Sequence, residues 1–254
     1  GIVAGLLALV VASGAQAAAL LVADGASGKI QVFDTATHAY VGEFADTSGL
    51  GAGSIVAMDS NADGSKLYVA MWDSSYSASG GKIYTYDVTG VGTAATGSNP
   101  TLFYQHTLGG WGYRMNMTLG PDQSGDGVGD VYFTVPVPNW NNETVYWVDA
   151  VAGGAATSYQ NIGSKNNVKL VFKADGSLGW GHAVVNNTDM QNWNSSLMGV
   201  YGSTGTLKYS ADDTSLMTGP NSWQTLTDNS WQWRIKDVLF GPDDTLYYTS
   251  YNED

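Results

Sequence analysis

The stretch IVAMDSNADGSKLYVAMW, residues 55–72, runs from an apolar segment through a turn of Asp, Asn, Gly and Ser into a second segment that carries Leu-Tyr. The same arrangement returns at residues 115–135, 168–185 and 235–251, with Val-Tyr, Leu-Gly-Trp or Leu-Tyr in the second segment. The copies start at positions 55, 115, 168 and 235, so they are 60, 53 and 67 residues apart. Spacing this regular indicates one strand-turn-strand unit that is repeated along the chain and stacked on its neighbours.

The composition favours short strands joined by tight turns. The 254 residues include 33 glycines, 15 tyrosines and 9 tryptophans, whereas charged residues make up only 13%. Glu, Lys and Arg favour helices and are scarce here, and one all-β domain of this length is common. We therefore predict an all-β fold, a β-propeller of four-stranded antiparallel blades, with about four to five blades present in an incomplete ring.

Alternation of apolar and polar residues predicts the strands of the first unit, and the later units keep only the strand-turn-strand pattern. The first unit has three hairpin strands within residues 20–44 and lacks an inner strand. A last strand pair is expected at 235–240 and 246–250. The strands expected in between are 55–58, 66–72, 81–88 and 102–108 in the second unit, 115–119, 130–137, 144–149 and 158–162 in the third, and 168–172, 178–185, 205–209 and 223–226 in the fourth.

The first unit carries the sharpest family resemblance. It reads Leu20-Leu21-Val22 and then, after a turn, Gly28-Lys29-Ile30-Gln31-Val32-Phe33-Asp34. This resembles the repeat of YVTN-type and NHL-type β-propellers, in which a Leu-Tyr-Val-like strand leads to a Gly-x-Ile-x-Val-x-Asp strand. The resemblance is close over residues 20–44 and loose over residues 54–108. In closed propellers of this kind the other end of the chain commonly supplies a missing inner strand.

The N-terminal segment predicts export. Residues 1–11 are apolar or glycine, and Ala15-Gln16-Ala17 gives an Ala-x-Ala cleavage pattern. This predicts a signal peptide over residues 1–17 without its charged n-region, followed by a propeller domain over residues 18–254 that is truncated at its C-terminus. The protein would be secreted, periplasmic or at the cell surface, with no membrane span after signal removal. Two alternatives are a buried strand or helix, and a retained N-terminal anchor or assembly helix as in pilins.

The net charge of the chain disfavours some classes of ligand. A net charge of −13 repels phosphate groups, so nucleic acid and anionic lipid are disfavoured as ligands, whereas calcium or a polar carbohydrate suits this surface. The chain contains no cysteine, so disulfides and thiolate metal sites are excluded. Any bound metal must use oxygen or histidine ligands.

Residues 122–130, DQSGDGVGD, form the strongest candidate metal loop. Oxygen side chains stand at loop positions one, three, five and nine, and a glycine at position six allows a sharp turn, a pattern that suits calcium. The loop resembles those of FG-GAP and VCBS propeller repeats, which read Asp-x-Asn-x-Asp-Gly-x-x-Asp and lead directly into a strand. The ion would stabilise a turn, or else the segment is a long Gly-Asp hairpin loop without an ion. The candidate ligands are Asp122, Ser124, Asp126, the carbonyl of Val128, and Asp130.

The equivalent loop one unit earlier is a weaker calcium candidate. Asp59, Asn61 and Asp63 supply positions one, three and five, but Leu67 replaces the acidic residue at position nine.

A metal-dependent propeller hydrolase is the alternative function. Asn116 and Asp237 lie near the starts of two expected inner strands, and residues 237–243 resemble the matching stretch of lactonase and gluconolactonase-like propellers. Lys236 stands where that family has a metal-binding Asn, and no acidic residue precedes Ile55 or Val168 in the same register. A binding role is therefore favoured over an enzymatic one.

Aromatic and amide side chains in two expected loops are candidates for ligand contacts. Trp140 and Trp193 can stack on a sugar ring or anchor an interface, and Asn192 and Asn194 flank the second tryptophan. These features favour an extracellular or cell-surface binding or scaffold module for a protein or carbohydrate ligand, stabilised by calcium. A surface-layer or filament subunit is a further alternative.

Overall fold

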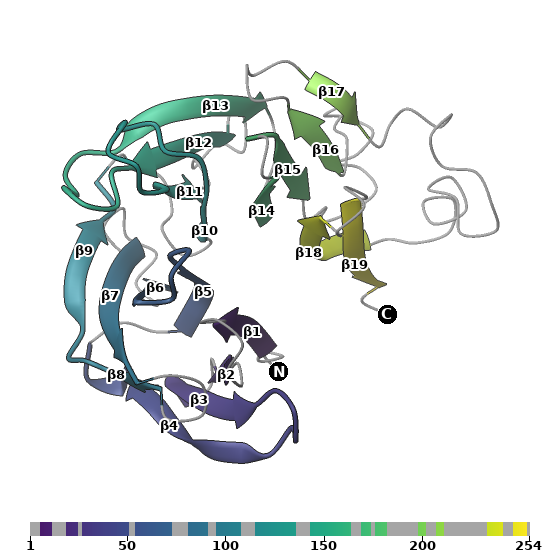
Figure 1. The fold of residues 1–254 in the computed structure, drawn as a ribbon. Helices are drawn as coiled ribbons and strands as arrows, with labels where there is room; N and C mark the ends of the chain where they lie inside the picture. Colours follow the sequence, from purple (N-terminus) through teal and green to yellow (C-terminus); the bar gives the residue numbers. More distant parts are fainter. Residues whose placement is uncertain are drawn as a thin grey trace. The chain divides into compact units, whose positions relative to one another are not determined.

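The fold is all-β, and the prediction of four-stranded antiparallel blades of the propeller type is confirmed (Figure 1). The only helix among the described residues is a short 3-10 turn, Ser48–Leu50. The computed structural model describes residues 6–11, 19–24, 27–50, 54–72, 81–90, 95–107, 115–135, 143–163, 169–173, 176–181, 198–201, 207–210, 233–240 and 246–252.

The first sheet has the order β1-β2-β3-β4. Its first strand is the segment that the sequence interpreted as a signal peptide, so the prediction that this unit lacks an inner strand is wrong. Residues 6–11 of this segment pair antiparallel with the next strand along its whole length, so this part is a strand and not an assembly helix. Whether residues 1–17 are cleaved stays a prediction. The strands are β1 Leu6–Val11, β2 Ala19–Asp24, β3 Lys29–Asp34 and β4 Tyr40–Asp46.

The second and third sheets follow the predicted strands closely. In the second, β7 pairs with β6 on one side and with both β8 and β9 on the other. The third has the order β10-β11-β12-β13. The strands are β5 Ser54–Ser60, β6 Lys66–Trp72, β7 Gly81–Thr89, β8 Thr96–Gly97, β9 Thr101–Gln105, β10 Asn116–Leu119, β11 Val131–Val135, β12 Glu143–Val148 and β13 Thr157–Gly163.

The fourth sheet corrects one assignment. Its order is β14-β15-β16-β17, with β14 Lys169–Phe172, β15 Leu178–Gly181, β16 Met198–Tyr201 and β17 Leu207–Ser210. The segment expected as its third strand is therefore the fourth, because the short apolar run of β16 takes the place beside β15. Residues 223–226, expected as the last strand, lie outside the described residues.

The expected final pair is present, with β18 Trp233–Phe240 antiparallel to β19 Leu246–Asn252. Four sheets of at least four strands and one strand pair thus agree with the expected four to five blades. Within the described part of the chain there is no helix with the length and hydropathy of a membrane span.

The chain divides into two compact units, each of which is larger than one of the repeat units of the sequence. The first comprises residues 1–131 and 148–155, and the second comprises residues 132–147 and 156–254. The core of the first unit is built from alternate residues of its strands, Ile30, Val32, Leu67 and Val69 among them, all at most 2% exposed. In the second unit, a smaller cluster contains Tyr132, Val145, Leu170 and Leu178, with Tyr159 and Phe172 packed on the ring of Tyr132. Burial alternates along β3, as in a half-buried pleated strand, whereas residues 67–71 of β6 are buried on both faces.

Candidate functional site: hydrogen-bonded loops of the first unit

The loop between β10 and β11 is folded back on a buried carboxylate. Asp130 stands just before β11 and is fully buried. Its Oδ2 accepts hydrogen bonds from the backbone N–H groups of Gln123, at 2.6 Å, and Ser124, at 3.0 Å. The base of the loop is closed by Gly120 N–H donating to the Asp130 carbonyl at 3.0 Å. Asp130 therefore holds the loop through its side chain and closes its base through its carbonyl group.

Asp122 organises the tip of the same loop. Its Oδ1 accepts from Gly125 N–H at 2.6 Å and its Oδ2 from Gly127 N–H at 2.7 Å. These two amides, Gly127 first, hold the pKa of the Asp122 carboxyl below its usual value. Gly125 and Gly127 have φ angles of +82° and +89°, which glycine adopts without steric cost. The glycine expected to permit a sharp turn does so.

The calcium candidates share this loop, but the oxygens of its three aspartates accept hydrogen bonds from backbone amides, and Ser124 Oγ donates to Asp122 Oδ1 at 3.1 Å. Asp122 and Asp130 bind the amides described above, and Asp126 Oδ1 accepts from Val128 N–H at 2.8 Å. Among the described residues, which include the whole loop, no group of three or more His, Asp or Glu side chains is placed to hold a metal ion. The loop thus closes through its own hydrogen bonds, and a cation would have to use the lone pairs of these carboxylates that do not accept from amides. Calcium binding stays a prediction.

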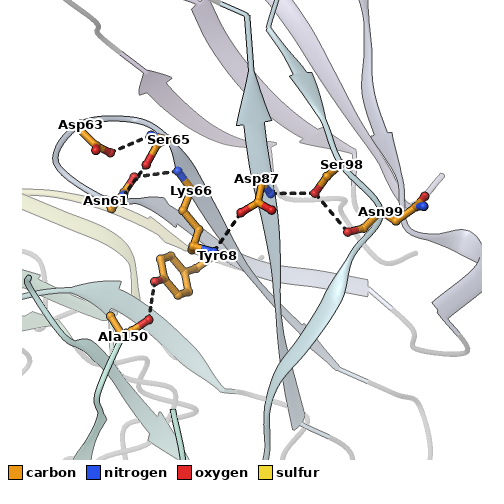
Figure 2. Close-up of polar contacts among 9 residues, drawn as sticks. All are labelled: Asn61, Asp63, Ser65, Lys66, Tyr68, Asp87, Ser98, Asn99 and Ala150. Atoms are coloured by element: carbon orange, nitrogen blue, oxygen red, sulfur yellow. Dashed lines mark hydrogen bonds and ion pairs between the residues drawn. The ribbon is translucent and has the colours of Figure 1, made fainter. Parts of the chain in front are cut away.

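The weaker candidate loop uses its three side chains for different tasks. Asn61 bonds to Ser65 and Lys66, with Oδ1 accepting from Lys66 N–H at 2.8 Å, and Asp63 Oδ1 accepts from Ser65 N–H at 2.9 Å (Figure 2). Asp59 instead binds β10, as described next. The three side chains therefore bind separate partners.

Asp59 joins the second sheet to the third. Its Oδ2 accepts from Thr118 Oγ1 at 2.9 Å and from Leu119 N–H at 2.8 Å, and its Oδ1 from Ser60 N–H at 2.9 Å. Burial raises the pKa of the Asp59 carboxyl, although these three donors act in the opposite direction. β5 and β10 pack on each other around this contact. Asp59 is therefore a structural link between sheets.

A second link runs from Tyr68 on β6 to the turn after β12. Figure 2 shows the Tyr68 hydroxyl donating to the carbonyl of Ala150, at 3.2 Å. The Ala150 N–H in turn donates to Asp130 Oδ1 at 3.2 Å, so the turn is held from both sides. Burial, with the nearby charges of Asp130 and Asp149, raises the pKa of Tyr68 to about 12. Its ring also lies edge-on to Phe103, with centroids 5.4 Å apart.

Sequence reasoning missed both links between sheets. Tyr68 was noted only as part of the Leu-Tyr of the repeat, and Asp59 was considered only as a calcium ligand. A local signal did exist for the turn that Tyr68 reaches. Asp149 Oδ1 accepts from the N–H groups of Val151 and Ala152, a common Asp turn.

Two buried tyrosines allow the Tyr68 link to be measured. Tyr86 is 1% exposed and its hydroxyl has no hydrogen-bond partner among the described residues, whereas the hydroxyl of Tyr68, 2% exposed, is bonded. We expect Tyr68→Phe to lower the free energy of unfolding by about 1 kcal/mol and Tyr86→Phe to leave it unchanged or raise it slightly. Urea denaturation of both variants checks this. Equal losses in both would mean that the Tyr68 bond contributes nothing specific.

An exposed polar row borders the second sheet. Lys66 Nζ lies 3.0 Å from Asp87 Oδ1, and Ser98 Oγ accepts from Asp87 N–H at 2.8 Å (Figure 2). An exposed ion pair of this kind contributes roughly 0–1 kcal/mol to the free energy of unfolding, so it has little effect on stability.

Several sequence candidates lie elsewhere. Trp140, Trp193, Asn192 and Asn194 lie outside the described residues. Asn116 begins β10 and is 5% exposed, so the Asn-Met-Thr triplet there is not presented for glycosylation in the folded chain. Asp237 lies within β18, opposite Thr249.

Comparison with known proteins adds little beyond the fold. No protein-family model matches the chain, and no curated protein matches it in sequence. Its structure is similar to the Dos1 propeller, over 95% of this chain and 51% of that one, with 13% identity and a TM-score of 0.47. A Bacteroides thetaiotaomicron protein of unknown function matches over 91% of this chain and 49% of its own, with 12% identity and a TM-score of 0.47.

A Bacteroides caccae protein of unknown function matches over 96% of this chain and 82% of its own, with 10% identity and a TM-score of 0.47. The chain spans about half the length of the first two of these structures. The fold assignment rests on the order of the sheets.

Proposed function

We propose that this protein is a β-propeller binding or scaffold module that acts outside the cell or at its surface. The observation that carries this is the loop at residues 121–130. Its backbone is tied to buried Asp130, while Gln123, Ser124 and Asp126 remain exposed. Binding residues are often placed on loops that a rigid scaffold holds, because little conformational entropy is then lost on binding.

The ligand class follows from the charge and polarity of this surface. The net charge of −13 disfavours anionic ligands, and the exposed loop side chains are hydroxyl, amide and carboxylate groups. Such groups suit the hydroxyls of a neutral carbohydrate or the polar surface of a protein. Export would follow from the apolar segment at residues 1–11.

A matched pair of glutamines tests the proposal. Gln123 is exposed in the loop, and Gln105 is exposed at the end of β9. The purified protein is first screened on an array of neutral glycans and extracellular proteins. For the ligand found, Gln123→Ala is expected to weaken binding about fivefold or more and Gln105→Ala to leave it unchanged. A ligand whose affinity is insensitive to Gln123→Ala, or no ligand at all, would count against this loop as the recognition surface.

Calcium is proposed as a stabiliser of the same loop. A site occupied at 100 times its dissociation constant adds about 2.7 kcal/mol to the free energy of unfolding, so calcium is expected to raise the melting temperature and a chelator to lower it. Asp126→Asn is the informative variant, because Asn keeps the oxygen that accepts from Val128 N–H but lacks the charge. It should melt like the parent protein in chelator and lose the calcium shift. A transition that does not respond to calcium or chelator would contradict the proposal.

The second candidate is a metal-dependent propeller hydrolase. The observation in its favour is that Asn116, one of the two residues named by the resemblance to lactonases, is buried at the start of β10. Lactone hydrolysis that requires a divalent cation and is abolished in Asn116→Ala would support it. Activity that survives this substitution would end the idea.

A further inference from the structure

Strand β1 makes the first sheet equivalent to its neighbours. Without it this sheet would have three strands, whereas the sheets that begin with β10 and β14 have four in chain order. β1 pairs with β2 through six consecutive residues, from Leu6 opposite Asp24 to Val11 opposite Ala19, without a bulge. It also packs on β5, the first strand of the second sheet. The pairing is thus complete along the edge of β2.

The burial of β2 is that of a strand with a partner on each side. Leu21 and Ala23 on one face and Val22 on the other are at most 7% exposed. β6 and β11, which hold the same second place in their sheets, are buried on both faces in the same way: Tyr68 and Val69 in β6, and Tyr132 and Phe133 in β11. By position and burial, β2 is an interior strand.

The β4 edge and the β2 edge of the first sheet differ in the features that protect a free edge. β4, at the far edge, pairs with β3 through two register irregularities and carries Glu43 in an ion pair with Lys29, at 2.7 Å. Bulges and charges of this kind keep free edges from pairing with other chains. β2 has no bulge against either neighbour, no proline and no lysine. Its edge is suited to being paired.

We propose that the edge of β2 is a strand-acceptor site, which binds an extended apolar segment in antiparallel register, and that residues 6–11 of the same chain fill it. Main-chain hydrogen bonds supply the affinity of such sites. It follows that β1 stays bound even when the chain is cut between β1 and β2. Cleavage after Ala17, at the Ala-x-Ala pattern, would leave either this non-covalent complex or, once β1 is lost, an open site for another apolar strand.

The first test uses the full chain with a protease recognition sequence inserted between Gly14 and Ala15. After cutting, the N-terminal fragment is expected to co-elute with the rest of the protein in gel filtration, with the melting temperature preserved. A labelled synthetic peptide of residues 4–13 should exchange into the complex and displace the fragment in a saturable manner. Release of the fragment without any change in melting, and no uptake of the peptide, would overturn the proposal.

The second test needs no cut. Successive residues of an antiparallel strand direct their N–H groups to opposite sides, so only one of Ala8 and Leu9 donates towards β2. Of the variants Ala8→Pro and Leu9→Pro, one should therefore accelerate hydrogen exchange of the β2 amides by at least about tenfold and the other by less. Ser13→Pro, between the two strands, is the control and should have no effect. Unchanged exchange in both strand variants would overturn the proposal even if the cut chain failed to fold.

Discussion

Asp130→Ala is expected to lower the free energy of unfolding by about 3 kcal/mol or more, because it removes the acceptor of three backbone amides at once. A buried donor left without a partner costs roughly 1–3 kcal/mol, and the three costs are not fully additive because water can reach the loop. The amides are those of Gln123, Ser124 and Ala150. The carboxylate is fully buried, so no other side chain is expected to replace it. Urea denaturation measures the loss.

Two further variants separate the hydrogen bonds from the charge. Asp130→Asn keeps one acceptor oxygen but turns an N–H₂ group towards the remaining amides, so we expect about half of the loss. Asp126→Ala removes an exposed carboxylate from the same loop that accepts only from Val128 N–H, and it should cost less than about 1 kcal/mol. Hydrogen exchange at Gln123, Ser124 and Ala150 should accelerate only in the Asp130 variants. Similar losses at Asp126 and Asp130 would show that Asp130 does not hold the loop.

Asp59→Ala is expected to cost about 2–3 kcal/mol, because it leaves the Leu119 N–H facing a space without an acceptor and leaves the Thr118 hydroxyl only the Leu119 carbonyl, at 3.3 Å. The loss is measured by urea denaturation at pH 7. The matched control is Asp63→Ala, one turn further along the same hairpin. Its carboxylate is exposed and accepts from Ser65 N–H within the same turn, so the cost should be within about 1 kcal/mol. Equal costs at the two positions would contradict a link between β5 and β10.

The pH dependence of the Asp59 link has a definite sign. Burial raises the pKa of this carboxyl above its ordinary value of 3.8, so the folded state holds the proton more tightly than the unfolded state does. Its contribution to stability is therefore fully present below pH 3.8 and declines as the pH rises through the raised pKa. The stability of the parent protein minus that of Asp59→Asn should be largest in acid and smallest near pH 7. A difference that grows with pH would show that the hydrogen bonds outweigh burial.

The contribution of Asp122 to stability depends on pH with the opposite sign. Its lowered pKa means that its contribution is present above the ordinary value and is lost as the pH falls through the lowered one. This effect occurs in both the parent and the Asp59→Asn protein, so it cancels in their difference.

The two carboxylates explain why a repeated turn differs from copy to copy. Asp59 and Asp122 hold the first position in equivalent loops of successive units, and the sequence interpreted both as calcium ligands. In the structure Asp122 caps its own turn, whereas Asp59 points to a strand of the next sheet. The same loop position thus serves a strand of the next sheet in one unit and its own turn in the following one.

Much of the architecture was readable because its causes are local. Apolar segments bounded by turn residues marked nearly every strand of the second and third sheets, and the glycine at position six of the Asp122 loop was expected where the chain turns sharply. The fourth sheet shows the limit of this reasoning. Its strands are four residues each, and such short apolar runs in a polar stretch give too little periodicity to rank one above another.

The sequence by itself determined the all-β class, the repeating four-stranded unit and the chemistry of its turns, since each depends on residues within one hairpin of one another. Only the tertiary structure decided which groups meet across the repeats: Asp59 with Leu119, 60 residues away, Tyr68 with Ala150, 82 away, and residues 6–11 with β2. The physical reason is that burial, not spacing, selects these partners. A carboxylate or hydroxyl enclosed by neighbouring strands is stabilised by a hydrogen bond to them, and an apolar segment goes to the edge that lacks a strand.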